Sequence, residues 1–233
     1  MQDQLLLELL PPPAPAFDNF VAGGNAEVLH ALRALADGSS GERIVFLWGA
    51  SGSGRSHLLQ ACVAAARARG RDAAYCRGSD APAAWPAPGA LLALDELEQC
   101  DAAAQAALFT RLVTTREGDG AVVAAGDVAP AGLTLREDVR TRLGSGWVFQ
   151  VHPLRDDEKV AALAARAAER GFELPPDAAR HLLTRCPRDL PNLLAWLDRL
   201  DRSSLERQRP VSVRLLKELL DGARPRQGMP DGA

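Results

Sequence analysis

A glycine-rich stretch, Gly49-Ala50-Ser51-Gly52-Ser53-Gly54-Arg55-Ser56, connects a predicted strand to a predicted helix. The residues before it, Arg43–Trp48, form a short apolar run that is typical of a buried parallel strand. The residues after it, Ser56–Arg69, are rich in Ala and predict a helix that ends at Gly70. A glycine-rich loop in this position lets successive backbone N–H groups face a phosphate, and the helix N-terminus adds positive potential. The stretch therefore predicts a P-loop.

The residues of this loop have distinct predicted roles. We expect Gly49, Gly52 and Gly54 to shape the backbone around the phosphates, and the Ser56 hydroxyl to bind Mg²⁺. Arg55 stands where the P-loop pattern has Lys, and we expect it to reach the β- and γ-phosphates. Arginine keeps the charge but is bulkier and forked, which favours a diphosphate or hinders placement of the γ-phosphate. A Gly/Ser turn that binds no nucleotide is the alternative interpretation.

Acidic residues follow two later predicted strands. Leu91-Leu92-Ala93-Leu94 is an apolar strand that ends at Asp95 and Glu96, which is the Walker B pattern. We expect Asp95 to bind Mg²⁺ and Glu96 to polarise an attacking water. Asp127 follows the next apolar strand, where a sensor residue would contact the γ-phosphate or the water; an ordinary turn residue is the alternative. The ordered combination of loop and acids favours a nucleotide site.

Strands and helices alternate through the first part of the sequence. The predicted strands are Arg43–Trp48, Ala73–Cys76, Leu91–Leu94, Ala121–Ala125 and Trp147–Val151, with predicted helices over 26–35, 56–69, 101–116 and 135–143. This alternation predicts an α/β core with a parallel five-stranded sheet that helices cover on both faces. After Pro153 the strands stop, and the segments 156–170, 176–186, 190–208 and 212–220 predict a small all-helical lid.

These patterns divide the sequence into four expected parts. A flexible tail over residues 1–16 contains Pro11-Pro12-Pro13-Ala14-Pro15, which cannot be helical. The nucleotide-binding core extends over residues 17–152 and the helical lid over 153–221. A disordered polar tail over 222–233 completes the expected organisation.

The composition limits the classes of function. The net charge of −3 argues against a free-standing DNA-binding protein, because such proteins are usually basic. The four cysteines show no metal-type spacing and suit reduced thiols, and no apolar run approaches the ~20 residues that cross a bilayer. We therefore expect a cytoplasmic protein with no membrane segment. Only Lys159 and Lys217 are lysines, so an arginine at position 55 also reflects a general use of arginine.

Three segments carry a resemblance to a known family. They are Phe17-Asp18-Asn19-Phe20-Val21 with Asn25, Gly54-Arg55-Ser56-His57-Leu58-Leu59, and Leu94-Asp95-Glu96-Leu97-Glu98. Together they resemble the bacterial replication initiator DnaA, and the similarity runs from Phe17 to about Leu220. The resemblance implies an AAA+ P-loop core with a helical lid, and ADP or ATP with Mg²⁺ as its ligands.

Within this family, the sequence is most similar to the Hda-type regulators, which stimulate hydrolysis of the ATP bound to DnaA. DnaA has a DNA-binding domain after its lid and an N-terminal oligomerisation domain, and we expect no counterpart of either in this protein. Gly171-Phe172-Glu173-Leu174-Pro175 in the lid also resembles Hda, as does the arginine in the P-loop lysine position. We therefore expect a protein of this branch.

The N-terminal segment Gln4-Leu5-Leu6-Leu7-Glu8-Leu9 is similar to the peptide by which Hda binds the DNA sliding clamp, the β subunit of DNA polymerase III. In an extended segment Leu5, Leu7 and Leu9 lie on one side, where they would fill an apolar groove. Gln4 would form a hydrogen bond at the edge of that groove. The alternative is an apolar tail that docks on its own core.

The resemblance also implies roles for residues outside the loop. Arg142 matches the arginine finger that DnaA-type proteins present to the ATP of a neighbouring subunit, and Arg140 competes with it for that role. Arg188 matches the second sensor, which points from the lid to the nucleotide. The other residues expected beside the nucleotide are Phe20 and Val21, near the adenine, and His57, in a packing or local bonding role.

The expected function is negative regulation of the initiation of chromosomal replication. In this hypothesis the ADP-bound chain is tethered to the DNA-loaded clamp and offers Arg142 to ATP held by DnaA, while its own ATPase activity is weak. It would contact DNA only through the clamp, and the resemblance leaves a homo-oligomer open. The alternatives are an autonomous ATPase, such as a helicase loader, and a scaffold whose nucleotide is structural.

Overall fold

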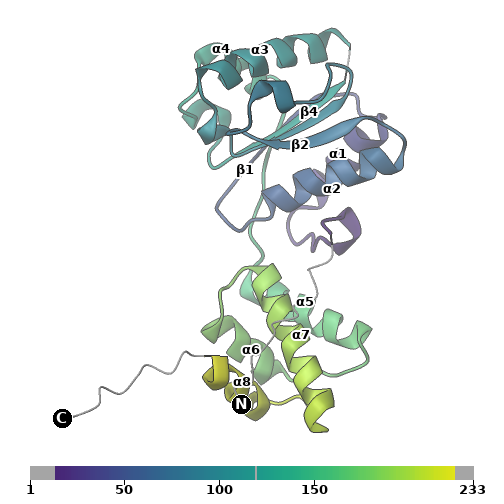
Figure 1. Ribbon diagram of the computed structural model, residues 1–233, viewed down its shortest axis with the longest axis vertical. Helices are drawn as coiled ribbons and strands as arrows, with labels where there is room; N and C mark the ends of the chain where they lie inside the picture. The colour runs from purple at the N-terminus through teal and green to yellow at the C-terminus, as the bar shows by residue number, and fades with distance from the viewer. Residues whose placement is uncertain (1–13, 119, 224–233) are drawn as a thin grey trace, which may run out of the picture. The chain divides into compact units, whose positions relative to one another are not determined.

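The computed structural model describes residues 14–118 and 120–223, which divide into two compact units. The first unit extends from Ala14 to Leu154, and the second begins at Arg155. The predicted clamp-binding residues Gln4, Leu5, Leu7 and Leu9 lie outside the described residues, as does the predicted C-terminal tail from residue 224 onward. Figure 1 shows the two units, each of which is described separately below.

A five-stranded parallel sheet forms the centre of the first unit. Its strands are β1 (Ile44–Trp48), β2 (Ala73–Arg77), β3 (Leu91–Asp95), β4 (Ala121–Gly126) and β5 (Trp147–Gln150). Their order across the sheet is β2-β3-β4-β1-β5, and every neighbouring pair is parallel. The predicted parallel five-stranded sheet is thus confirmed. Every residue of β3 and β4 is buried, as their continuous apolar sequences require.

Helices cover both faces of this sheet, as Figure 1 shows. The helices are α1 (Ala26–Asp37), α2 (Arg55–Ala68), α3 (Ala102–Glu117) and α4 (Glu137–Gly144), with single 3₁₀ turns η1 (Phe17–Asn19), η2 (Pro82–Ala84), η3 (Leu97–Gln99) and η4 (Pro130–Gly132). Alternate residues of β1 face opposite cores, as the period of a strand requires. Val45 and Leu47 pack with α1 and α2, whereas Ile44 and Phe46 pack with α3 and α4.

The described part of the second unit contains helices and the loops that join them, and no strand. It consists of α5 (Asp156–Glu169), α6 (Pro176–Arg185), α7 (Leu190–Arg207) and α8 (Val213–Ala223). A leucine core holds the four helices together, and Leu163, Leu182, Leu197 and Leu215 are fully buried in it. The predicted helical lid is thus confirmed. Among the described residues of the whole chain, no helix combines the length and the apolar character needed to cross a membrane.

Asn25 joins the start of the first unit to the end of its sheet. Its side chain is 1% exposed and makes two hydrogen bonds with the backbone of His152, just beyond β5. The amide Nδ2 donates to the His152 carbonyl at 2.9 Å, and the His152 N–H donates to Oδ1 at 2.8 Å. A carboxamide satisfies both backbone groups at once because it carries a donor and an acceptor side by side. The residue therefore fixes the chain that precedes α1 against the chain that follows β5.

Replacing Asn25 with Ala should lower the free energy of unfolding of the full chain. The His152 donor and acceptor would lose their partners, and each unsatisfied group of this kind costs about 1–3 kcal/mol. Because both bonds are only partly buried, we expect a total loss near the lower end of the summed range, about 2–3 kcal/mol, in urea denaturation followed by tryptophan fluorescence. The control is Asn19→Ala, because Asn19 is exposed and water can replace its bonds. Equal losses for the two variants would contradict the role assigned to Asn25.

Candidate nucleotide site

The loop between β1 and α2 has a backbone that only glycine permits at two positions. Gly49 has a φ of +157°, and an added Cβ would lie 2.4 Å from the Val151 carbonyl oxygen. Gly54 has a φ of +99°, and its Cβ would lie 2.7 Å from the ring of Phe20. Both contacts are shorter than a real Cβ tolerates, so the strand end and Phe20 can approach the loop only because these residues lack side chains.

The same loop has the features of a phosphate cradle. Gly52, at φ +76°, has no atom within 4 Å of the position of an added Cβ, so the space beside it is open. Gly54 supplies no side-chain cap to α2, which leaves the first N–H groups of that helix available. The Ser53 hydroxyl is buried and has no hydrogen-bond partner among the described residues. Ser56 is exposed in the first turn of α2. This donor set fits phosphate groups.

Arg55 connects the loop to the end of β4. One guanidinium nitrogen, Nη1, donates to the Gly126 carbonyl, and the other, Nη2, lies 2.6 Å from Asp127 Oδ1. The Arg55 side chain is 13% exposed, whereas that of Asp127 is 66% exposed. A planar guanidinium can bind a carbonyl and a carboxylate at the same time through its two terminal nitrogens. A lysine ammonium is a compact point charge and does not fix the directions of two such bonds. The structure thus brings together two predicted site residues, Arg55 and Asp127, in one ion pair.

Asp95 is held by a hydrogen bond on each of its carboxylate oxygens. The carboxylate is 4% exposed, and its Oδ2 accepts from the Tyr75 hydroxyl at 2.8 Å. Its Oδ1 accepts from the Glu96 N–H at 3.0 Å. Glu96 has a φ of +54°, a left-handed conformation that is uncommon for residues other than glycine and that costs of order 1–3 kcal/mol. Such strain is often found at functional sites, and here it follows directly after the carboxylate.

Tyr75 and Arg77 also belong to this site, although no pattern in the sequence indicates them. Burial, followed by the hydrogen bond to Asp95 and the charge of Asp95, raises the pKa of Tyr75 to about 12. The hydrogen bond with Tyr75 raises the pKa of Arg77, and the charge of Glu96 adds to this effect. The pairing of β2 with β3 explains the proximity, since Arg77 lies opposite Asp95 in the register. No local sequence pattern specifies that register.

Glu98 is a third residue whose role the sequence did not indicate. It lies in η3, after the predicted acids, and its Oε1 accepts a hydrogen bond from the Asp127 N–H. An added Cβ at Gly126 would lie 2.8 Å from the same Oε1, so a glycine at the end of β4 allows the carboxylate to approach. Glu98 therefore connects the segment after β3 to the segment after β4.

Phe20 and His57 lie on the other side of the loop. Their ring centroids are 5.5 Å apart, and Phe20 packs against Gly54. The His57 Nε2 lies 3.0 Å from the Ala16 carbonyl oxygen, which is a local bond to the segment before α1. Val21 is half-buried next to Phe20. The structure thus places Phe20, one of the two residues expected near an adenine, against the P-loop.

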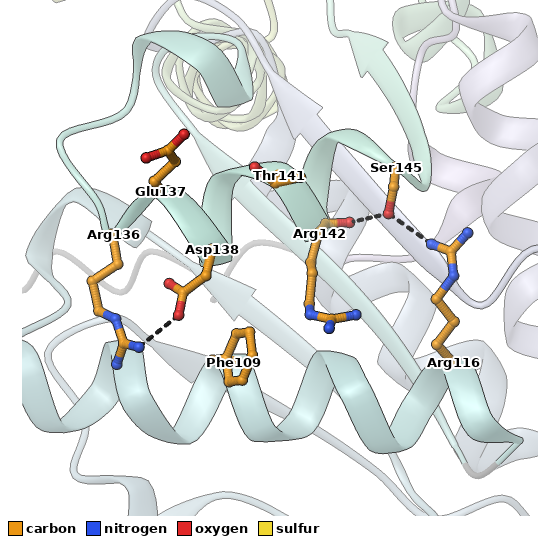
Figure 2. Close-up of a pocket in the computed structure, with 8 residues that line it drawn as sticks. All are labelled: Phe109, Arg116, Arg136, Glu137, Asp138, Thr141, Arg142 and Ser145. Atoms are coloured by element: carbon orange, nitrogen blue, oxygen red, sulfur yellow. Dashed lines mark hydrogen bonds and ion pairs between the residues drawn. The ribbon is translucent and has the colours of Figure 1, made fainter.

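Arg142 and Arg140, the two candidate finger arginines, both lie in α4 but have different surroundings. The Arg142 guanidinium carbon lies 5.0 Å from the centre of the Phe109 ring, and the Arg136 guanidinium carbon lies 5.8 Å from it. Figure 2 shows Arg136 and Arg142 on either side of Phe109. Arg136 is paired with Asp138 at 2.6 Å, whereas Arg142 is paired with no carboxylate among the described residues. Arg140 donates to the Ala131 carbonyl at 3.1 Å.

Arg188, the predicted second sensor, belongs to the helical unit. Its guanidinium Nη1 lies 3.7 Å from Asp156 Oδ2, and its side chain is 64% exposed. Asp156 is the first residue of α5, so this exposed ion pair links the start of α7 to the start of α5 within the lid.

Comparison with known proteins finds similarities for both units. Residues 156–220 match the family model described as "Hda, lid domain". The chain resembles AMPPCP-bound DnaA from Aquifex aeolicus, with a TM-score of 0.71 and 20% identity over 83% of this chain and 67% of that chain. It also resembles domain III of Thermotoga maritima DnaA, with a TM-score of 0.71 and 18% identity over 90% of this chain and 97% of that chain. The chain has a DnaA-like AAA+ fold with an Hda-type lid.

The AAA+ fold is shared more widely than DnaA. The Thermotoga maritima RuvB branch-migration motor matches with a TM-score of 0.67 and 16% identity, over 89% of this chain and 72% of that chain. The expected AAA+ fold is confirmed by these solved structures, and the expected lid is confirmed by the match to the Hda lid model. At these identities the solved structures establish the fold alone, so the function must be argued from the site.

The raised pKa of Tyr75 can be measured directly, because it is the single tyrosine of the chain. We expect its phenolate absorbance at 295 nm to appear with a midpoint near pH 12 while the chain is folded. A pKa raised on folding stabilises the protein below the unfolded value of about 10, and this stabilisation is lost as the pH rises through the folded value. In Asp95→Asn, which removes the charge, the midpoint should fall towards 10. A midpoint near 10 in the unaltered protein would contradict the Tyr75–Asp95 contact.

Proposed function

We propose that this chain is an ADP-binding regulator that stimulates hydrolysis of the ATP held by DnaA. The observation that carries the proposal is the environment of Arg142, which lies half-exposed against an aromatic ring and has no carboxylate partner among the described residues. The DnaA-like fold and the Hda-type lid support DnaA as the partner. The function is thus negative regulation of replication initiation.

The chain's own nucleotide would be held by the residues described above. The backbone of the loop from Gly49 to Gly54, with Arg55, would bind the phosphates, and Phe20 and Val21 would lie near the adenine. Mg²⁺ commonly binds through one or two protein groups together with phosphate oxygens. Ser56, exposed in the first turn of α2, and Asp95, the last residue of β3, supply a hydroxyl and a carboxylate for that role.

ADP is the nucleotide that these residues favour. Arg55 is bulkier than the usual lysine, and its ion pair with Asp127 holds the guanidinium at the sensor strand. A charged, forked side chain in this place takes room at the γ-phosphate end of the site. Arg188 of the lid would add a positive charge that suits a diphosphate. An adenine nucleotide as such is supported by the similarity to Aquifex aeolicus DnaA, whose structure contains AMPPCP, an analogue of ATP.

Arg142 is better suited than Arg140 to act on a partner's nucleotide. The Arg140 guanidinium donates to the backbone of its own chain at Ala131, and its Nε is buried. The Arg142 guanidinium is held by the Phe109 ring, which attracts a cation without neutralising its charge. A finger must keep its charge and its donors free for the transferring phosphoryl group, whose transition state spreads charge over three equatorial oxygens. Arg142 meets that requirement.

The N-terminal peptide would supply the tether to DNA. Gln4, Leu5, Leu7 and Leu9 have the spacing of an extended apolar anchor, which suits the groove of the sliding clamp. Tethering raises the effective concentration of the regulator near its partner without a new contact between them. In this proposal the clamp provides the proximity to DNA, and self-association into a homo-oligomer is not required.

Replacing Arg142 with Ala should remove most of the stimulation of DnaA-bound ATP hydrolysis. An arginine finger supplied in trans is worth roughly 10³–10⁵ in rate, so the loss should be at least about 4 kcal/mol of barrier lowering. Arg142→Lys should also fail, because an ammonium cannot present a planar fork. The measurement is radiolabelled ATP hydrolysis by DnaA with clamp-loaded DNA, in the presence and absence of each variant.

The matched control is Arg140→Ala, which removes an arginine two positions away and should have a mild effect. ADP affinity and clamp binding should be unchanged in all three variants. Loss of stimulation in Arg140→Ala with retention in Arg142→Ala would reverse the assignment of the finger. Rapid ATP turnover by the isolated protein, with no effect on DnaA, would instead favour the autonomous ATPase.

The tether can be tested separately from the finger. Replacing Gln4, Leu5 and Leu9 together with Ala should abolish binding to the isolated clamp, because the apolar anchors and the edge hydrogen bond are lost. The melting temperature and the ADP affinity should remain unchanged. The measurement is surface plasmon resonance on immobilised clamp. Retention of clamp binding by this variant would rule out the peptide as the tether.

A further inference from the structure

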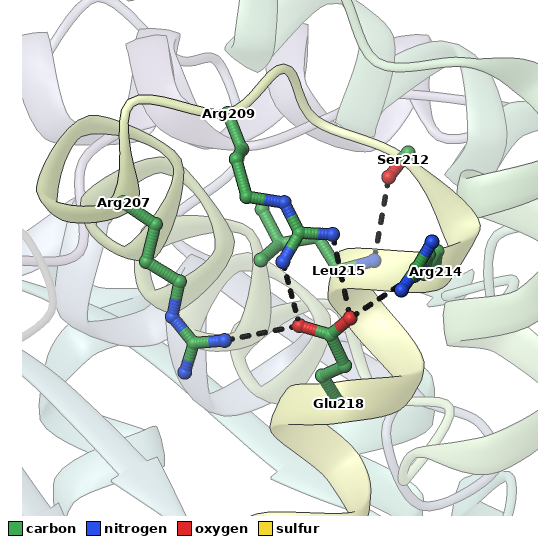
Figure 3. A network of polar contacts seen from close by, with 6 residues as sticks. All are labelled: Arg207, Arg209, Ser212, Arg214, Leu215 and Glu218. Carbon is green, nitrogen blue, oxygen red and sulfur yellow. Dashed lines mark hydrogen bonds and ion pairs between the residues drawn. The ribbon is translucent and has the colours of Figure 1, made fainter.

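One carboxylate in the lid is surrounded by three arginines. Arg207 lies at the end of α7, Arg209 in the connection to α8, and Arg214 one turn before Glu218 on α8. The distances from the guanidinium nitrogens to the Glu218 oxygens are 3.1 Å for Arg207, 2.9 and 3.3 Å for Arg209, and 3.3 Å for Arg214. Figure 3 shows the three arginines approaching Glu218 from different sides. We name these four residues the lid arginine cluster.

The lid arginine cluster carries an excess of positive charge. Hydrogen bonds and charge from Arg209, and then from Arg214, hold the pKa of Glu218 below its usual range, so Glu218 is ionised at neutral pH. It still neutralises only one of three guanidinium groups, and no second carboxylate pairs with any of them among the described residues. From residue 202 to residue 218 the sequence has five cationic and two acidic side chains, although the whole chain has a net charge of −3.

The helices on either side hold the cluster in place. The Ser204 hydroxyl donates to the Arg209 carbonyl at 2.6 Å, which fixes the connection against α7. The Ser212 hydroxyl accepts from the Leu215 N–H at 3.3 Å, and Leu215 is fully buried in the lid core. The N-terminus of α8 therefore lies beside the arginines, and its dipole adds to their positive potential. Charges fixed in this way need little rearrangement to bind an anion.

The arginines retain donors that face solvent. Arg207 and Arg214 each use one nitrogen on Glu218 and are 46% and 84% exposed. A guanidinium has five N–H donors in a fork that matches two phosphate oxygens. A protein surface that recognises a specific peptide usually offers several apolar contacts beside its charged ones. In the described lid, Leu205 is the one large apolar side chain that is exposed. The chemistry of the surface therefore suits phosphate better than an acidic peptide.

We propose that the lid arginine cluster is a binding site for the phosphodiester backbone of nucleic acid. The site would read no base sequence, because guanidinium contacts to phosphate carry none. Two or three phosphate contacts give weak binding that depends steeply on salt, with a slope of log K against log salt of about −2 to −3 for a duplex. This site does not depend on the proposed action on DnaA, and it would add affinity wherever another contact already holds the chain near DNA.

The test is fluorescence anisotropy of a labelled 20-base-pair duplex, and of one of its single strands, with the full chain and Mg-ADP in 25–200 mM KCl. We expect binding at 25 mM KCl that weakens with salt at the slope given above. The double variant R207Q/R214Q should lose about tenfold or more in affinity at 25 mM KCl, and its slope should decrease by about 2. The tighter of the two probes would identify the form of nucleic acid.

The matched control is R166Q/R180Q, which removes the same charge from the same lid. Arg166 and Arg180 each form an exposed pair within one helix, with Glu169 and Asp177. This variant should bind the duplex within twofold of the unaltered protein. Should R207Q/R214Q melt at a lower temperature, the single variant R214Q, at an 84% exposed position, should lower the affinity and the slope by about half as much on a logarithmic scale.

Three outcomes would overturn the proposal. The first is the absence of binding at 25 mM KCl, and the second is an equal loss of affinity in the control variant. The third is displacement of the duplex by a polyglutamate peptide as effectively as by unlabelled DNA at equal charge. That result would assign the cluster to an acidic protein surface. Failure of the Arg142 variants to affect DnaA would leave all three measurements interpretable, because none of them contains DnaA.

Discussion

The position of β1 between β4 and β5 is the constraint on which the first unit depends. Parallel pairing places the carboxyl ends of these three strands at one edge of the sheet. The P-loop starts at this edge, and the lack of a side chain at Gly49 lets the Val151 carbonyl lie against it. Asn25 then closes the edge by binding the next residue, His152, through both of its backbone groups. The shape of the loop is therefore set by strands that are distant from it in the sequence.

The charged groups at this edge form two separate networks of hydrogen bonds and ion pairs. Arg55 binds Gly126 and Asp127 at the end of β4, and Glu98 accepts from the Asp127 N–H. Tyr75 binds Asp95 at the end of β3, and Arg77 is coupled to Tyr75. Asp95 is held by a donor from the neighbouring strand β2 and Asp127 by Arg55 of α2, so these charges are fixed in place before a ligand binds. Such preorganisation is what electrostatic stabilisation at a reaction site requires.

The sequence predicted the elements well and the contacts less well, for physical reasons. The apolar runs of β1, β3 and β4 are buried on both faces, which makes them visible without any knowledge of their partners. The spacing of the glycines in the P-loop likewise reflects a local backbone requirement. Tyr75 depends on the register of β2 against β3, and Glu98 on the approach of η3 to β4. These contacts are set by tertiary structure, so they leave no pattern in the sequence near either residue.

The arginines of this chain differ mainly in what neutralises them, which their uniform abundance in the sequence hides. Arg55 is in an ion pair with Asp127, and Arg188 lies near Asp156. Arg142 lies on the Phe109 ring, an environment that attracts the cation and leaves its charge in place. A guanidinium in an ion pair shares its charge with the carboxylate and offers a ligand only its remaining donors, whereas one held by a ring keeps its full charge. Arg142 therefore differs from the ion-paired arginines named here because it offers a partner its full charge together with its donors.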